Sequence, residues 1–119
     1  MKSYNLKLPW PPGNNHLYTV VRGRKIKSDK GRKYTELIIQ QVKLANQQYQ
    51  LSGRLRIEIV ASPPDRRNRD LDNLFKAPLD SLTQSGVIAD DSLIDDIRMV
   101  RGDVIKGGRL DVQIWELAP

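Results

Sequence analysis

Arg54-Leu55-Arg56-Ile57-Glu58-Ile59-Val60-Ala61, or RLRIEIVA, is the stretch from which the fold can be predicted. Leu55, Ile57 and Ile59 alternate with mostly polar neighbours, which is the pattern of a β-strand with one buried face. Pro63-Pro64 follows, and proline cannot donate a hydrogen bond to a sheet. A strand that ends in an irregular loop is therefore predicted here.

The segments before this strand predict another strand and a helix. Tyr4 to Pro9 alternates in the same way, and Val21 to Lys27 is typical of a basic loop or hairpin. Ser28 or Asp29 is expected to cap a helix in a region that ends at Gly53. The apolar positions with helical spacing in that region are Tyr34, Leu37, Ile38, Val42, Ala45 and Tyr49.

A second helix is predicted from Asp70 to about Ser85, with Gly86 as its stop. Pro78 lies inside it, and an interior proline costs about 3 kcal/mol, so we expect a kink or an early break there. The apolar positions of this helix are Leu71, Leu74, Phe75, Leu79 and Leu82.

Two strand-like segments complete the chain, Ile94 to Ile105 and Leu110 to Leu117, with Lys106 to Arg109 as a plausible hairpin turn between them. The expected order is β-α-β-α-β-β. This order predicts a single α/β (mixed α+β) domain over residues 1–119, built on a mixed sheet.

Composition limits the chemistry. The 119 residues include 20 Lys and Arg against 14 Asp and Glu, one histidine (His16) and no cysteine. Zinc sites built from Cys and His are thereby excluded, and no local motif supports a catalytic triad around His16. Phosphate-binding glycine motifs are absent, so no nucleotide cofactor is expected. The net charge of +6 suggests a polyanionic partner, although a solvated basic surface explains it equally well.

Two further absences bear on the expected localisation of the protein. No apolar run approaches the ~20 residues of a membrane span. A chain without cysteine has no disulfide framework, which makes the cytoplasm the default expectation.

The sequence RRNRDLDNLFK, residues 66–76, concentrates both signs of charge. Arg66, Arg67 and Arg69 have the planar guanidinium fork that suits phosphate binding. Asp70 and Asp72 could hold a hard metal ion, Mg²⁺ or Mn²⁺, that acts on a bound phosphate. The alternative for the arginines is a solvated basic loop.

The acidic residues also have structural alternatives. Asp70 could be a helix N-cap, and Asp72 could stabilise the positive end of the helix dipole. Asp72 and Lys76 are four residues apart, so they could form a surface ion pair. Lys76 could instead offset charge in the transition state of phosphodiester hydrolysis. Asp90 and Asp91 can join this group only if the helix ends are rearranged.

With these residues identified, the chain resembles the RusA family of Holliday-junction resolvases over nearly its full length. The residues that carry the resemblance are Leu8 to Asn15 (LPWPPGNN), Asp65 to Leu74 with Lys76, Asp80, Leu82, the Asp90-Asp91 pair, and Lys106 to Arg109. Gly13 stands where the family often has Ser. Members of this family are often encoded by prophages, so a bacterial prophage origin is consistent with the resemblance.

The resemblance implies a Mg²⁺-dependent, homodimeric endonuclease that nicks two opposing strands of four-way DNA junctions symmetrically. It implies metal-binding catalytic roles for Asp70, Asp72 and Asp91 and a catalytic role for Lys76, and it leaves the role of Asp90 open. A homodimer also has a physical reason: one chain carries one acidic cluster, and two matched cuts need two sites related by a two-fold axis.

Two other functions remain open on the sequence. One is a non-catalytic DNA junction-binding protein, and the other is an enzyme that acts on a small phosphate substrate. Asn14 and Asn15 could contact DNA, or they could form an ordinary turn in Pro-Gly-Asn-Asn.

Overall fold

Strand β4, Leu55–Ser62, lies inside a four-stranded mixed sheet in the computed structural model, which describes residues 2–117. The strand order is β1-β6-β4-β5, with β4 antiparallel to β6 and parallel to β5. The other strands are β1 (Ser3–Leu8), β5 (Ile94–Arg101) and β6 (Arg109–Glu116), and a separate hairpin is formed by β2 (Tyr18–Val21) and β3 (Arg24–Lys27). The helices are α1 (Asp29–Leu44) and α2 (Lys76–Gln84), with short 3-10 helices η1 (Asn14–His16), η2 (Leu71–Leu74) and η3 (Asp91–Leu93). The predicted single α+β domain is confirmed, and the basic segment is a hairpin.

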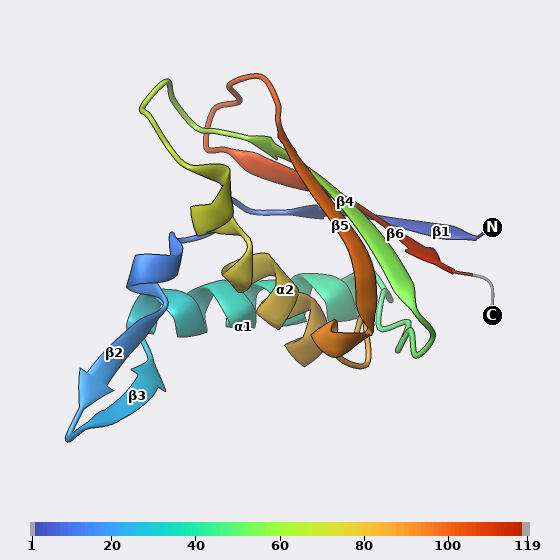
Figure 1. Cartoon of the computed structure of the whole chain (residues 1–119), viewed down its shortest axis with the longest axis horizontal. Helices are drawn as coiled ribbons and strands as arrows, with labels where there is room; N and C mark the ends of the chain where they lie inside the picture. Colours follow the sequence, from blue (N-terminus) through green and yellow to red (C-terminus); the bar gives the residue numbers. More distant parts are fainter. Residues whose placement is uncertain (1, 118–119) are drawn as a thin grey trace.

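The core lies between one face of the sheet and the two helices (Figure 1). Leu55 and Ile57 of β4 are completely buried, as are Ile38 and Val42 of α1. Each such aliphatic side chain contributes about 1.5–3 kcal/mol on burial. The alternation in RLRIEIVA therefore orients β4 toward the helices, as predicted.

Helix α1 begins where the sequence predicts and ends earlier. Ser28 caps it, with the Oγ atom accepting a hydrogen bond from the Gly31 backbone at 3.1 Å. The helix ends at Leu44, not near Gly53, because Asn46 adopts a left-handed φ of 55°. The Gln47 N–H then donates to the Val42 carbonyl at 2.9 Å, which is one of the bonds of a Schellman stop.

The second predicted helix is two helices. The 3-10 helix η2 ends at Leu74, and α2 begins at Lys76. Pro78 lies in the first turn of α2, where its missing N–H needs no partner within the helix, and it causes no break after itself. The break comes before the proline because the ring would clash with the carbonyl four residues earlier, which belongs to Leu74.

The predicted hairpin across residues 106–109 is wrong. A local turn exists there, with the Gly108 N–H donating to the Ile105 carbonyl at 2.8 Å. However, β4 lies between β5 and β6, so the connection crosses the end of β4. Strand β4 forms backbone hydrogen bonds along both of its edges, with β5 on one side and β6 on the other. The sequence pattern of β5 and β6 does not reveal that β4 lies between them.

Candidate active site

The loop between β4 and η2 is held in shape by Arg69. Its Nη1 atom lies 2.8 Å from Asp65 Oδ1, and the same atom donates to the carbonyl of Arg67 at 3.3 Å. The guanidinium also lies over the Trp10 ring, 5.7 Å from its centroid. From the other side, Arg101 donates to the Arg69 carbonyl at 2.6 Å. Arg69 therefore organises the loop that carries the other two arginines.

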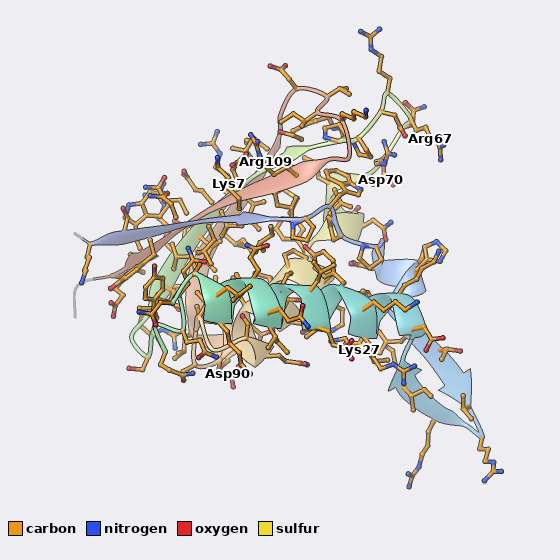
Figure 2. The ribbon with its side chains drawn as sticks, turned by 180° about the vertical axis from the view of Figure 1, so that it is seen from behind. Lys7, Lys27, Arg67, Asp70, Asp90 and Arg109 are labelled. Atoms are coloured by element: carbon orange, nitrogen blue, oxygen red, sulfur yellow. The ribbon has the colours of Figure 1, made fainter. Side chains whose placement is uncertain are left out.

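The carboxyl group of Asp65 is the acidic partner in this loop. Hydrogen bonds from Arg69 and from the Arg67 backbone lower the pKa of Asp65 to about 2. Arg66 and Arg67 are both exposed, and Figure 2 shows Arg67 at the outer edge of the molecule. Their predicted role in phosphate binding remains a prediction, and their position leaves them accessible to DNA.

Asp70 and Asp72 follow directly at the start of η2. Asp70 holds the N-cap position, but its side chain makes no capping hydrogen bond. Within residues 2–117, neither carboxylate has a hydrogen bond or ion pair, and the predicted Asp72–Lys76 surface pair is absent. The helix break at Phe75 explains this, since residues four apart are neighbours only within one α-helix. Both carboxylates line a groove of about 540 Å³.

Asn14 connects the N-terminal turn to this segment. Its backbone N–H donates to Asn73 Oδ1 at 3.0 Å, and its side chain donates to the Asp72 carbonyl at 3.1 Å. Asn14 Oδ1 accepts from the Lys76 backbone at 3.4 Å. Asn14 therefore positions both Asp72 and Lys76, while Asn15 is exposed in the same groove.

Gly13 allows this close approach. A Cβ atom at position 13 would lie 2.5 Å from the Asn73 amide nitrogen. A serine here would require the Asn73 side chain to move, although that side chain already accepts the Asn14 bond.

Lys76 lies close to the second acidic group of the chain, which comprises Asp80, Asp90 and Asp91. Its Nζ atom is 5.5 Å from the centroid of the Tyr18 ring, and the Tyr18 hydroxyl donates to Asp80 Oδ2 at 3.0 Å. Desolvation raises the pKa of Asp91, the neighbouring Asp90 and Asp80 charges raise it further, and the Lys76 charge opposes them. Lys76, Asp80, Asp90 and Asp91 thus lie within electrostatic reach of one another.

The pKa of Asp90 is shifted in the opposite direction, downward. Its carboxylate accepts the Ser92 N–H at 3.0 Å as the N-cap of η3, and this hydrogen bond lowers its pKa. Of the two carboxyl groups, Asp90 therefore has the lowered pKa and Asp91 the raised one.

Asp80 and Tyr18 were missing from the predicted site. Asp80 could have been found from the sequence, because it lies four residues after Lys76 and a helix places residues with that spacing on one face, as α2 does. Tyr18 could not have been found in this way, since only the folded hairpin brings its ring close to α2.

The structure does not gather Asp70, Asp72 and Asp91 into one set of metal ligands. Among residues 2–117, no group of three or more acidic or histidine side chains is placed to hold one ion. Figure 2 shows Asp70 at one end of the molecule and Asp90 well separated from it. The carboxylate oxygens are nevertheless the donors that Mg²⁺ and Mn²⁺ prefer, and Mg²⁺ often uses only one or two carboxylates plus water and substrate phosphates. The pair at residues 70 and 72 fits that smaller requirement.

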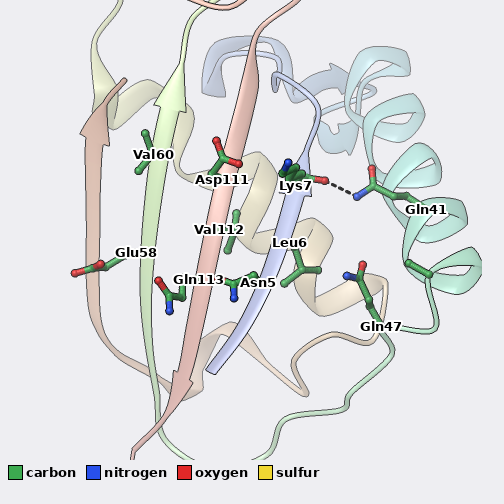
Figure 3. Close-up of a pocket in the computed structure, with 11 residues that line it drawn as sticks. Asn5, Leu6, Lys7, Gln41, Gln47, Glu58, Val60, Asp111, Val112 and Gln113 are labelled. Carbon is green, nitrogen blue, oxygen red and sulfur yellow. Dashed lines mark hydrogen bonds between the residues drawn. The ribbon is translucent and has the colours of Figure 1, made fainter. Parts of the chain in front are cut away.

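A larger groove lies elsewhere. It has a volume of about 650 Å³, runs along β1, β6 and β4, and reaches the end of α1 (Figure 3). Lys7, Glu58 and Asp111 are among its charged residues. No residue of the predicted site lines it, so its volume does not identify the active site.

The chain belongs to a family of DNA-cutting enzymes, because the family model of endodeoxyribonuclease RusA matches residues 9–115. The chain is 43% identical over 117 residues to the crossover junction endodeoxyribonuclease RusA of Escherichia coli (strain K12), with 98% of each chain covered. The protein of the same name from Shigella sonnei (strain Ss046) is also 43% identical, and that of Enterobacteria phage 82 is 42% identical, both over 98% of each chain. The resemblance noted in the sequence is therefore confirmed. In residues 2–117, no helix has the length and apolar character needed to cross a membrane.

Proposed function

We propose that this chain is a metal-dependent endodeoxyribonuclease that resolves four-way DNA junctions by paired symmetric nicks, as a homodimer, in recombination and repair of bacterial or phage DNA in the cytoplasm. The observation that carries this proposal is the arrangement around η2. Asp70 and Asp72 line an open groove, and along the chain they stand between the exposed Arg66-Arg67 pair and Lys76.

Each part of this arrangement has a task in phosphodiester hydrolysis. Arg66 and Arg67 hold backbone phosphates and bring an anionic substrate toward carboxylates that would otherwise repel it. Asp70 and Asp72 supply the protein ligands of Mg²⁺ or Mn²⁺, which would lower the pKa of bound water and offset negative charge. Lys76 stabilises charge on the phosphorane or the leaving oxygen.

Asp91 has a separate place in the proposal. Desolvation and the neighbouring Asp90 and Asp80 charges raise its pKa, and the Lys76 charge opposes them, so Asp91 lies in a cluster of interacting charges next to Lys76. A closer approach to Asp70 and Asp72 on DNA binding would complete a three-carboxylate set. The sequence-based assignment of Asp91 as a metal ligand depends on that rearrangement.

The decisive experiment compares Asp72→Asn with wild type on labelled four-way junctions and linear duplex, with and without Mg²⁺. Wild type should cut junctions at paired positions only with metal. Asp72→Asn should lose at least about 10²-fold in cleavage rate, the size typical of removing one charge-stabilising group, and should keep junction binding. Glu36→Gln, an exposed change on α1, is the matched control and should cut normally.

A non-catalytic junction-binding protein remains the second candidate, because the three predicted metal ligands do not meet in the single chain. Tight junction binding without cleavage by the wild-type dimer in Mg²⁺ and in Mn²⁺ would favour it. Equal cleavage by Asp72→Asn would remove Asp72 from the mechanism.

A further inference from the structure

The β2–β3 hairpin extends away from the packed body of the molecule (Figure 1). Its base is firmly attached. Leu17 is buried in the core, and its carbonyl accepts the Ser28 N–H at 2.8 Å. The Tyr18 hydroxyl donates a hydrogen bond to Asp80 of α2. The base of the hairpin is therefore held against the body of the molecule, while its tip contacts no other element among residues 2–117.

The hairpin combines cations with exposed aliphatic side chains. Residues 18–27 contain four basic residues and no Asp or Glu, namely Arg22, Arg24, Lys25 and Lys27. Val20 is 71% exposed, and Val21 and Ile26 are exposed as well. A solvated hairpin needs the cations only, and exposed aliphatic side chains clustered on one projection indicate a contact.

One face of the hairpin continues into the candidate active site. The strand register places Tyr18, Val20, Lys25 and Lys27 on one face, because directly paired residues share a side, and it places Val21 and Ile26 on the opposite face. An aliphatic side chain is therefore exposed on each face of the hairpin. Lys25 and Lys76 both lie over the Tyr18 ring, at 4.7 and 5.5 Å from its centroid. A DNA strand at Lys76 would therefore meet this face next.

The tip carries an arginine in an unfavourable conformation. Arg22 has a φ of 52° and Gly23 a φ of 75°, as a tight hairpin turn requires. Glycine or asparagine would suit the first position better than arginine. A cation kept at a strained tip is consistent with a binding role there.

We propose that this hairpin enters the branch point of the junction, with its cations on the flanking phosphates and its aliphatic side chains against the exposed faces of base pairs. The inference rests on the proposed function and names the part of the substrate that the hairpin recognises. Apolar side chains that insert between base pairs must unstack them, at a cost of a few kcal/mol per step. At a branch point the stacking is already interrupted, so the same insertion costs less there than in a continuous duplex.

The test replaces Val20, Val21 and Ile26 by threonine, which keeps the β-branched shape and the strand preference. Binding is measured in EDTA, so that no DNA is cut, on a four-way junction with 2-aminopurine at the branch point and on linear duplex. Wild type should raise the 2-aminopurine fluorescence. The triple variant should bind the junction at least about tenfold weaker, a loss equivalent to about 1.4 kcal/mol. It should give no fluorescence rise, and its affinity for duplex should change less than twofold.

Val60→Thr, the same change at an exposed position of β4, is the matched control and should behave as wild type. Should the triple variant fail to fold by circular dichroism, Val20→Thr alone replaces it, since that side chain is mostly exposed. A variant that still binds and unstacks the junction like wild type overturns the inference.

Two further outcomes separate this inference from its premise. If wild type cuts junctions and the triple variant still prefers junctions to duplex as strongly as wild type does, the role of the hairpin is overturned and the proposed function stands. Wild type that binds no junction overturns both. A smaller sedimentation mass of the triple variant would show that the hairpin joins two copies of the chain, which also overturns the inference.

Discussion

At the scale of single residues, the three arginines of the β4–η2 loop have different surroundings. The Arg69 guanidinium is occupied by Asp65, by two backbone carbonyls and by the Trp10 ring. Arg66 and Arg67 extend from the loop that Arg69 stabilises. The sequence indicated a basic cluster, but it could not distinguish a positioning arginine from an exposed one, because that difference depends on Trp10, far away in the chain.

Asp65 gives a prediction about pH. Its folded-state pKa of about 2 lies below the ordinary value, so its ion pair stabilises the fold above about pH 4 and the contribution is lost as the pH falls through 2. Asp65→Asn should therefore lower the thermal midpoint at pH 7, and the difference from wild type should vanish near pH 2. Thermal unfolding monitored by circular dichroism across this range is the measurement. A difference that is constant with pH would contradict the assignment.

Arg22 gives a prediction about strain. Replacing it by asparagine, which tolerates the left-handed conformation, should raise the free energy of unfolding by up to about 1 kcal/mol. The same change should weaken junction binding, because a cation is lost. Urea unfolding and fluorescence anisotropy measure the two effects, and a protein that is less stable would show that the Arg22 side chain contributes to the fold.

At the scale of elements, periodicity predicted the four strands of the main sheet, placed the end of β5 at Ile105 rather than Arg101, and failed at the helix ends. The end of α1 depends on Asn46, whose left-handed conformation had no counterpart in the apolar pattern. Tyr49 keeps helical spacing and yet packs on the Tyr4 ring, with 4.6 Å between the centroids. The start of α2 was also missed, because the effect of Pro78 acts on the turn that precedes it.

Pro78 gives a prediction at this scale. Pro78→Ala should lower the free energy of unfolding by about 0.5–1 kcal/mol, although alanine favours helices, because the unfolded chain gains freedom. Pro78 is also buried, so some packing is lost. Urea denaturation tests this expectation. A gain in stability would mean that the break before Lys76 is imposed by packing rather than by the proline.

At the scale of the whole molecule, the two basic segments proposed to contact DNA lie on one side. The β4–η2 loop and the β2–β3 hairpin both lie on the side of the molecule away from the start of β1 and the end of β6, the loop above and the hairpin below in the view of Figure 1. The candidate site was predictable from the sequence as far as its residue types, since Asp70, Asp72 and Lys76 lie close together in the chain. Whether Asp91 joins them was not predictable, because it depends on how η3 returns along α2.

The salt dependence of junction binding tests this asymmetry. Replacing both Arg66 and Arg67 by glutamine should reduce the slope of log affinity against log salt by about one unit per arginine. Arg54→Gln is the control, because Arg54 lies at the start of the β4 region and is held by Asp95 at 3.0 Å. A control that changes the slope as much would mean that DNA also contacts the opposite end.

The pairing of β1 with β6 has a practical consequence. Ser3 lies opposite Trp115, so the start of β1 and the end of β6 lie together at the end of the sheet remote from the hairpin (Figure 1). A tether, dye or purification handle joined to either strand end would point away from the proposed substrate path. Surface-immobilised molecules could thus be watched one at a time while both the arginine loop and the hairpin remain open to solution.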